Sequence, residues 1–319
     1  MSENRRVVVT GLGAITPVGN NVKETWEGLK NGKNGIAPIT CFDTTGYKAT
    51  LAAEVKGFDP KEYMEVNEIL RTDRYVQLAI GAAESGIKGN VVPERFSVLF
   101  GTGIGGINTF ESEYRKLMEK GPRRVSPLFI PMLIANMAAG MIAIHHDCRG
   151  TAMPAVTACA SGSDAIGEAM RLIRHGYADA VITGGTEAAI SASAVAGFAN
   201  MKALSTADDP NEASLPFDKR RAGFVIGEGA VALILEEYEH AKARGAKIYG
   251  EVCGYGSTCD AFHMTAPHPE ARGGAQAMMD AMKEAGYSEN DTVYVNAHGT
   301  GTPKNDSIET IAIKKALGE

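Results

Sequence analysis

The sequence lacks several features that mark secreted, membrane or nucleic-acid-binding proteins. No long apolar segment precedes the first strand-like run, residues 7–11, so we expect no signal peptide. Positive charge is not in excess, because the formal net charge is −6, whereas binding to phosphate backbones needs a clustered Lys/Arg face. Nucleic acid is therefore not an expected partner.

Cysteine is scarce, with 5 residues in a chain of 319, and no C-x-x-C pair occurs. This odd, scattered set is typical of reduced thiols in the cytoplasm rather than of a disulfide framework or a zinc site. His145 and His146 are adjacent, and Cys253 and Cys259 do not stand at a ligand spacing either. We expect a cytoplasmic protein with no metal.

Long hydrophobic runs are also missing, with one exception at residues 126–144, which carry no charge. The length would suit a membrane span. Pro127, Pro131, Asn136 and Gly140 interrupt it, so we expect a buried or interface helix and no span.

What is abundant is glycine, at 37 residues, and a regular alternation of short apolar runs with helical patterns. Short continuous apolar strands separated by helices indicate a sheet that is covered on both faces, which makes the class α/β. The expected strands are residues 7–11, 97–101, 155–159, 178–185 and 229–237, and the expected helices lie near 22–31, 74–87, after 110, and from 160 to 175.

The pattern then restarts, which predicts a weak internal duplication. Residues 247–256 resemble 7–13, and residues 292–303 resemble 95–106, since each of the last two is a strand that opens into Gly-Thr-Gly. A helix is expected near 275–286. We therefore expect a first half at 1–246 and a second half at 247–319. If the halves were equal, up to about 115 residues of the second would be absent.

The segment 155–173 is the sharpest candidate for chemistry. A strand-like run ends at Cys159, and small residues then begin a helix. A thiol at a helix N-terminus is favoured as a thiolate, and the same N–H groups can hold an oxyanion. A buried structural cysteine is the alternative that spacing alone leaves open.

His298 is the candidate partner, because it also follows a strand-like run and precedes a Gly-rich loop. It could exchange protons or donate to an oxyanion, or it could be a structural histidine. If the duplication holds, Cys159 and His298 could face one site. The turn at 11–19 resembles a dinucleotide fingerprint only in part, because Thr16 and Pro17 stand where its third glycine belongs, so no nicotinamide cofactor is expected.

Together these segments resemble the condensing enzymes of the thiolase-like superfamily, in particular the elongating β-ketoacyl-[acyl-carrier-protein] synthase II branch. The matching text is VVVTGLGAITPVGN from residue 7, GTGIGG at 101–106, GPRRVSP at 121–127, TACASG at 157–162, LPFDKRRAGFVIGEGA at 215–230 and NAHGTGTPKND at 296–306. The resemblance implies a five-layered αβαβα fold of two pseudo-symmetric halves, the second incomplete, and a homodimer that uses no cofactor.

The resemblance also implies roles for single residues. Cys159 would be the nucleophile that accepts an acyl group, and His298 would assist decarboxylation of malonyl carrier protein. Ile104 would gate the acyl pocket together with Phe198. Two acidic residues, Asp260 and Glu309, would brace the active site.

The implied partner is acyl carrier protein, which is acidic, so a basic patch is expected despite the negative net charge. Its candidate residues are Arg71, Arg123, Arg124 and Lys202. The family's second catalytic histidine, a lysine before it and a C-terminal Gly-Phe-Gly-Gly loop find no match in this sequence, so we expect a truncated chain that loads acyl groups but condenses poorly.

Three alternatives remain open at this point. The chain could be a non-catalytic or acyl-loading-only partner subunit of the same fold, a polyketide ketosynthase, or a thiolase. Ile104 and the GPRR segment favour fatty-acid elongation.

Overall fold

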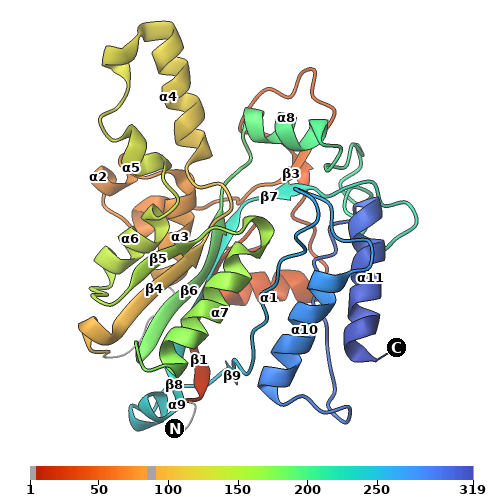
Figure 1. Ribbon diagram of the computed structural model, residues 1–319. Helices are drawn as coiled ribbons and strands as arrows, with labels where there is room; N and C mark the ends of the chain where they lie inside the picture. The colour runs from red at the N-terminus through yellow and green to blue at the C-terminus, as the bar shows by residue number, and fades with distance from the viewer. Residues whose placement is uncertain (1–4, 85–90, 319) are drawn as a thin grey trace. The chain divides into compact units, whose positions relative to one another are not determined.

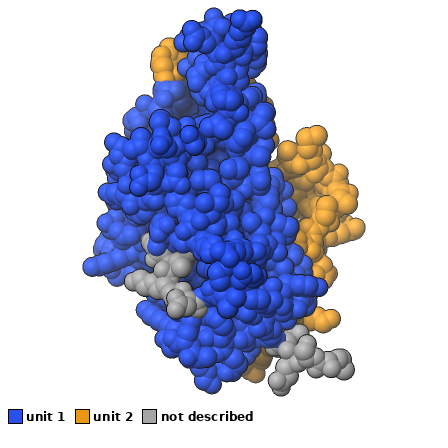
Figure 2. Space-filling model, turned by 90° about the vertical axis from the view of Figure 1, so that its left-hand side faces the viewer, with its two compact units in different colours: residues 1–42, 52–195, 227–252 blue, residues 43–51, 196–226, 253–319 orange. Residues whose placement is uncertain are grey.

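A computed structural model describes residues 5–84 and 91–318 of the chain. The contacts divide it into two compact units (Figure 2). Unit 1 comprises residues 1–42, 52–195 and 227–252, and unit 2 comprises residues 43–51, 196–226 and 253–319. The units therefore do not follow a single cut in the sequence.

Unit 1 is built on a six-stranded mixed sheet in the order β5-β4-β6-β8-β1-β9 (Figure 1). Strand β4 runs parallel to β5 and β6, whereas β8 pairs antiparallel with both β6 and β1. The strand bounds are β1 Val7–Ile15, β4 Phe96–Gly101, β5 Ala152–Ala155, β6 Ala180–Glu187, β8 Gly229–Glu237 and β9 Gly250–Glu251. Every residue of β4 is buried, as expected of a strand covered on both faces.

Helices cover both faces of this sheet. On one face α3 (Arg74–Glu84) and α6 (Met137–His145) form the main core with alternate strand residues such as Val98, Phe100 and Ile182. The strand residues in between face α7 (Ser161–Arg174), which packs along β4 and β6 (Figure 1). The predicted α/β architecture of this part is confirmed. The last residues of the helix expected at 74–87 lie outside the described residues.

Shorter elements complete unit 1. The uncharged run 126–144 forms two helices, α5 and α6, instead of the single one expected, because Ile134 between them is extended. None of the described helices has both the length and the apolar composition that a membrane span requires. The remaining helices are α1 Val22–Lys30, α2 Val66–Ile69, α4 Ile107–Lys120, α5 Phe129–Leu133 and α9 Tyr238–Ala243, with 3₁₀ turns η1 Pro60–Glu62, η2 Pro93–Arg95, η3 Pro122–Arg124 and η4 Ala158–Ala160.

Unit 2 contains the helices α10 (Arg272–Ala285) and α11 (Pro303–Leu317), which pack together through small residues including Ala275 and Ala312. Helix α8 (Ala192–Asn200) begins in unit 1 and ends in unit 2. A small sheet, β2-β3-β7, consists of Ala37–Pro38, Leu51–Ala53 and Ile226–Gly227, and most of these residues belong to unit 1.

The strands expected in the second half are the main difference from the sequence prediction. Of residues 247–256 only β9 is a strand, and residues 292–302 form none. Tyr294 is 86% exposed, and no described strand pairs with this segment, so its β-rich sequence has no ladder to join. Gly254 and Gly256 instead lie against the backbone of α10, where a Cβ would approach the carbonyl oxygens of Ala281 and Ala277 to 2.1 and 1.9 Å.

Candidate active site

Cys159 lies in the 3₁₀ turn η4, directly before the 14-residue helix α7. The preceding strand β5 ends at Ala155, so the strand does not reach Cys159 as the sequence suggested. Ala158 has φ 52°, a left-handed conformation that costs a non-glycine residue about 1–3 kcal/mol. Ser161 holds this turn, because its hydroxyl donates to the Ala158 carbonyl at 2.6 Å and accepts from the Thr157 N–H at 2.9 Å.

The residue Cys159 is exposed, and the N-terminus of α7 provides positive electrostatic potential beside it. Two other cysteines of unit 1 differ in chemistry. Burial of the sulfur raises the pKa of Cys148 to about 12. The residue Cys41 is exposed, yet desolvation of its sulfur, which donates to the Ile190 carbonyl at 3.2 Å, raises its pKa to about 11.

Glycines bring the ends of β4 and β6 against the start of α7. A Cβ on Gly101 would lie 2.3 Å from the Ser161 carbonyl oxygen, and one on Gly185 would lie 3.2 Å from the Cα of Gly162. Both contacts are with backbone atoms, so Gly101 leaves no room for a side chain, and a Cβ at Gly185 would force its neighbour to shift by a few tenths of an ångström. The turn that carries Cys159 is thus fixed to the sheet by close backbone contact.

Ile104 lies in the turn that follows β4, and its side chain is 40% exposed. Glu187, the last residue of β6, accepts hydrogen bonds from the N–H groups of Gly103 at 2.8 Å and Ile104 at 3.2 Å. Sequence reasoning missed Glu187. Its partners lie more than eighty positions away, and no local pattern signals such a contact.

The candidate carrier-protein residues of unit 1 are on its surface. Arg123 and Arg124 are exposed in η3, and Arg71 is exposed two residues after the end of α2. The buried carboxylate of Glu113 on α4 accepts from the Ser126 N–H at 2.8 Å, which ties the end of the GPRRVSP segment to that helix. Lys202 is exposed in unit 2, with φ 57°.

His298 lies in unit 2, in an irregular segment whose backbone is hydrogen-bonded to carboxylates of α11. The side chain of Glu309 accepts from the N–H of His298 at 2.6 Å and from that of Gly299 at 2.8 Å. Gly299 has φ 51°, a conformation that suits glycine. His298 itself is exposed, so its imidazole is accessible from solvent.

Asp306 is a second site residue that sequence reasoning missed. It is 2% exposed, and it accepts from the N–H of Gly301 at 3.0 Å and of Phe217 at 2.6 Å. Arg221 stands 3.8 Å away and donates to the Pro303 carbonyl. An aspartate in the first turn after Thr302 and Pro303 is a helix-start signal that could have drawn attention to it.

Asp260 and Phe198 occupy other parts of unit 2. The Asp260 carboxylate accepts from the N–H groups of His268 and Gly273, so it orders the segment that leads into α10 rather than the His298 backbone. Phe198 packs edge-on against Phe224, with ring centroids 5.6 Å apart.

Two other features bear on what the site binds. In the fingerprint-like segment 11–19, Gly11 and Gly13 lie within the paired strand β1, and Gly19 bridges Thr16 in the turn that follows. Among residues 5–84 and 91–318, no group of three or more His, Cys, Asp or Glu side chains is placed to hold a metal ion.

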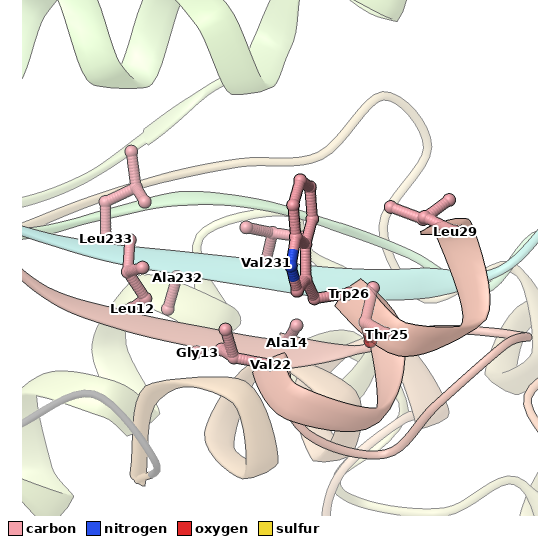
Figure 3. Close-up of a pocket in the computed structure, with 10 residues that line it drawn as sticks. All are labelled: Leu12, Gly13, Ala14, Val22, Thr25, Trp26, Leu29, Val231, Ala232 and Leu233. Carbon is pink, nitrogen blue, oxygen red and sulfur yellow. The ribbon is translucent and has the colours of Figure 1, made fainter. Parts of the chain in front are cut away.

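An apolar groove of about 200 Å³ lies between α1 and the β1–β8 pair (Figure 3). Trp26 and Leu29 line it on the helix side, and Leu12, Val231 and Leu233 line it on the strand side. None of its lining residues is ionisable, so it offers no acid, base or nucleophile.

Two family models, one after the other, together match nearly the whole chain. Residues 4–241 match "Beta-ketoacyl synthase, N-terminal domain", and residues 249–319 match "Beta-ketoacyl synthase, C-terminal domain". A 3-oxoacyl-[acyl-carrier-protein] synthase 2 of a Synechocystis species is 51% identical over 99% of this chain and 78% of its own length. One from Staphylococcus aureus is 50% identical over 100% of this chain and 78% of its own.

Solved structures give the same picture of the fold. The ishigamide ketosynthase/chain length factor superposes with a TM-score of 0.92 at 35% identity, covering 99% of this chain and 79% of that one. A type II polyketide ketosynthase in complex with its acyl-carrier protein has a TM-score of 0.90 at 33% identity, with the same coverage. The thiolase-like ketosynthase fold expected from the sequence is confirmed.

Proposed function

The chain belongs to the β-ketoacyl synthase family, and we propose that Cys159 is the nucleophile and His298 a catalytic histidine of the reaction. The family reaction is the decarboxylative condensation of an acyl thioester with a malonyl thioester on acyl carrier protein, and this chain is an acyltransferase of that class. One observation supports the role of Cys159 above all. It is an exposed thiol in a strained turn at the start of a long helix.

The first step is transfer of the acyl group to Cys159. The thiolate attacks the thioester carbonyl, a bond forms between the cysteine sulfur and the acyl carbon, and the carrier leaves as its thiol after taking up a proton. The positive end of the α7 helix dipole would stabilise negative charge on the sulfur and on the carbonyl oxygen of the intermediate.

The second step makes the carbon–carbon bond. The malonyl thioester loses carbon dioxide, and the electron pair left on its α-carbon attacks the acyl carbon. Cys159 then leaves as a thiolate. An imidazole at His298 would donate to the thioester oxygen on which negative charge develops. The Glu309 hydrogen bonds to the backbone of His298 and Gly299 support this role, because they hold that residue in place.

Two further proposals concern the acyl chain and the carrier protein. Ile104 and Phe198 would line and gate the acyl pocket. The exposed cations Arg71, Arg123 and Arg124, with Lys202, would attract the acidic carrier protein, and this attraction would weaken as salt screens it. One of the structural neighbours is a ketosynthase bound to its acyl-carrier protein, which supports this partner class.

The remaining expectations stay proposals. We propose that the chain forms a homodimer in the cytoplasm and that the first half ends near residue 246, between the two family matches. Asp260 is proposed to brace the site by ordering the segment before α10.

Acylation of the purified protein by an acyl carrier thioester tests the role of Cys159. We expect a mass increase of one acyl group that maps to Cys159 and disappears in Cys159→Ala. Cys41→Ala is the matched control and should load normally, because a thiol with a pKa of about 11 is almost entirely protonated at neutral pH. Loading of Cys159→Ala to the same extent would refute the assignment.

A polyketide ketosynthase is the second candidate function, because one structural neighbour, at 33% identity, is a type II polyketide ketosynthase. Malonyl-loaded and acyl-loaded carrier protein, supplied together, separate the candidates. One round of extension to a 3-oxoacyl product supports fatty-acid elongation, which the 50–51% identity to 3-oxoacyl synthases favours. Repeated extension without reduction would support the polyketide class, and acylation without product would support a loading-only partner subunit.

A further inference from the structure

The Glu187 carboxylate accepts three hydrogen bonds from a single turn. Its Oε2 accepts from the N–H groups of Gly103 at 2.8 Å and Ile104 at 3.2 Å, and its Oε1 accepts from the Thr102 hydroxyl at 3.1 Å. The Thr102 hydroxyl oxygen in turn accepts from the Gly105 N–H at 3.2 Å. One carboxylate at the end of β6 thus organises the whole turn that carries Ile104.

This arrangement is not an ordinary ion pair. In the part of the chain that the structure describes, no cation pairs with Glu187. Burial raises the pKa of its carboxyl, and the bonds from Gly103, Thr102 and Ile104 oppose that shift. Because a desolvated carboxylate without a cation is costly, its hydrogen bonds to the turn are what stabilise it there.

The same turn also contacts the nucleophile segment. A Cβ on Gly103 would lie 3.0 Å from Oε2 of Glu187 and 3.4 Å from the carbonyl oxygen of Ala158, the residue before Cys159. The Gly103 backbone is therefore enclosed between the carboxylate and the nucleophile turn. The Ala188 carbonyl, next to Glu187, accepts from the Asn108 side chain at 2.7 Å, which ties the start of α4 to the same strand end.

We propose that Glu187 is a positioning residue that sets acyl-chain selectivity by holding the backbone of Gly103 and Ile104, so that the Ile104 side chain keeps one orientation. This inference rests on the proposed function, in which Ile104 gates the acyl pocket. Glu187 touches neither the acyl group nor the reacting atoms. Its effect reaches the substrate through Ile104.

Three substitutions separate the contributions of the side chain. Glu187→Ala leaves two backbone N–H groups without their acceptor, so the turn loses its single conformation. Glu187→Gln keeps a carbonyl oxygen for the two N–H groups and can donate to the Thr102 hydroxyl, so it should preserve selectivity. Glu187→Asp keeps the charge but is one methylene shorter, and it serves as the second test if the alanine variant does not fold.

The readout is competition between hexanoyl and palmitoyl carrier thioesters for Cys159, measured by intact mass. We expect Glu187→Ala to bring the ratio of the two loading rates about tenfold closer to one. The ratio for Glu187→Gln should stay within about twofold of the wild-type ratio. Glu187→Asp should fall between them. A wild-type ratio in both Glu187→Ala and Glu187→Asp would overturn the proposal.

Glu54→Ala is the matched control. Glu54 accepts from the N–H groups of Thr40 and Cys41 and from the Thr40 hydroxyl, the same set of donors, but none of these residues belongs to the proposed site. It should lower stability without changing the ratio. An equal change in the Glu54 variant would show a general effect of lost hydrogen bonds and would contradict a specific role of Glu187.

A double-mutant cycle tests whether Glu187 acts through Ile104. In an Ile104→Ala background, Glu187→Ala should change the loading ratio by less than about twofold, because the side chain that it positions is gone. An additive change would refute the inference while leaving the role of Cys159 intact. If the wild type loads neither acyl group, the proposed function fails, and the inference about Glu187 fails with it.

Discussion

The two candidate catalytic residues are held in place by different means. The turn that carries Cys159 lies in unit 1, where backbone pairing of β4 with β5 and β6 and the contacts of Gly101, Gly162 and Gly185 fix it to the sheet. The segment that carries His298 lies in unit 2 and forms no strand. Two carboxylates of α11, Glu309 and Asp306, hold its backbone instead.

This difference determines what each region tolerates. Close backbone contact is sensitive to a single added carbon, because neither side can move without breaking strand pairing. Hydrogen bonds from the backbone to a carboxylate tolerate changes in the size of neighbouring side chains. They are lost when the carboxylate is removed, because the N–H groups then have no acceptor. The two regions should therefore respond to opposite kinds of substitution.

The largest effect is expected from Gly101→Ala. Its Cβ would lie 2.3 Å from the Ser161 carbonyl oxygen and 2.7 Å from the Gly162 nitrogen, both backbone atoms. We expect a loss of about 3 kcal/mol in the free energy of unfolding and a slower reaction of Cys159 with iodoacetamide. Urea denaturation and peptide mapping of the alkylated thiol measure the two effects.

Gly140→Ala in α6 is the control for this change, because nothing lies within 4 Å of its Cβ position. An added methyl group there should raise stability by about 0.5–1 kcal/mol through the unfolded state. Equal stability of the two variants would show that the turn that carries Cys159 can shift to accommodate a methyl group. The proposed contrast between the Cys159 and His298 regions would then not hold.

A smaller effect, about 2 kcal/mol, is expected from Asp306→Ala, which leaves the N–H groups of Gly301 and Phe217 without an acceptor. Asp306→Asn keeps one acceptor oxygen and should lose less. The exposed Asp280, which accepts from Gln276 on its own helix, is the control, and Asp280→Ala should change little. Thermal unfolding gives the stabilities, and diethylpyrocarbonate reports the reactivity of His298.

If Asp306→Ala leaves both the stability and the His298 reactivity unchanged, the hydrogen bonds of Asp306 do not hold the segment that carries His298. The loop would then owe its conformation to Glu309 or to its glycines.

The same contrast explains which features could be predicted. Strands β4, β6 and β8 follow from their continuous apolar residues, and Cys159 follows from a strand-like run that meets a helical pattern. Glu187 and Asp306 did not follow from sequence reasoning, because their partners at 103 and 217 are remote in the chain. Glu309 was anticipated only through the family resemblance. The strand expected within 292–303 does not form, because strand propensity needs a neighbouring strand.

The smallest effect tests whether a carboxylate in unit 1 also controls its site. Asp179 lies directly before β6, whereas Glu187 is the last residue of that strand. The Asp179 carboxylate forms ion pairs with Arg95 and Arg5. Hydrogen bonds from Arg95, and to a lesser extent Arg5, hold its pKa at about 2, below the usual 3.8. A lowered pKa contributes stability above the unfolded value, and this stability is lost as the pH falls from about 4 to 2.

Solvent screening reduces that contribution, so Asp179→Asn should cost about 1 kcal/mol at pH 7 and little at pH 2. Acid-induced unfolding, followed by circular dichroism, should therefore be less steep in the variant between those limits. Asp218→Asn is the control, since Arg220 lowers the pKa of that carboxyl too, but its side chain is more exposed than that of Asp179. The alkylation rate of Cys159 should not change in either variant. A slower alkylation of Cys159 in Asp179→Asn would mean that loss of the Asp179 ion pairs is transmitted along β6. Backbone pairing would then not be enough to fix the turn that carries Cys159.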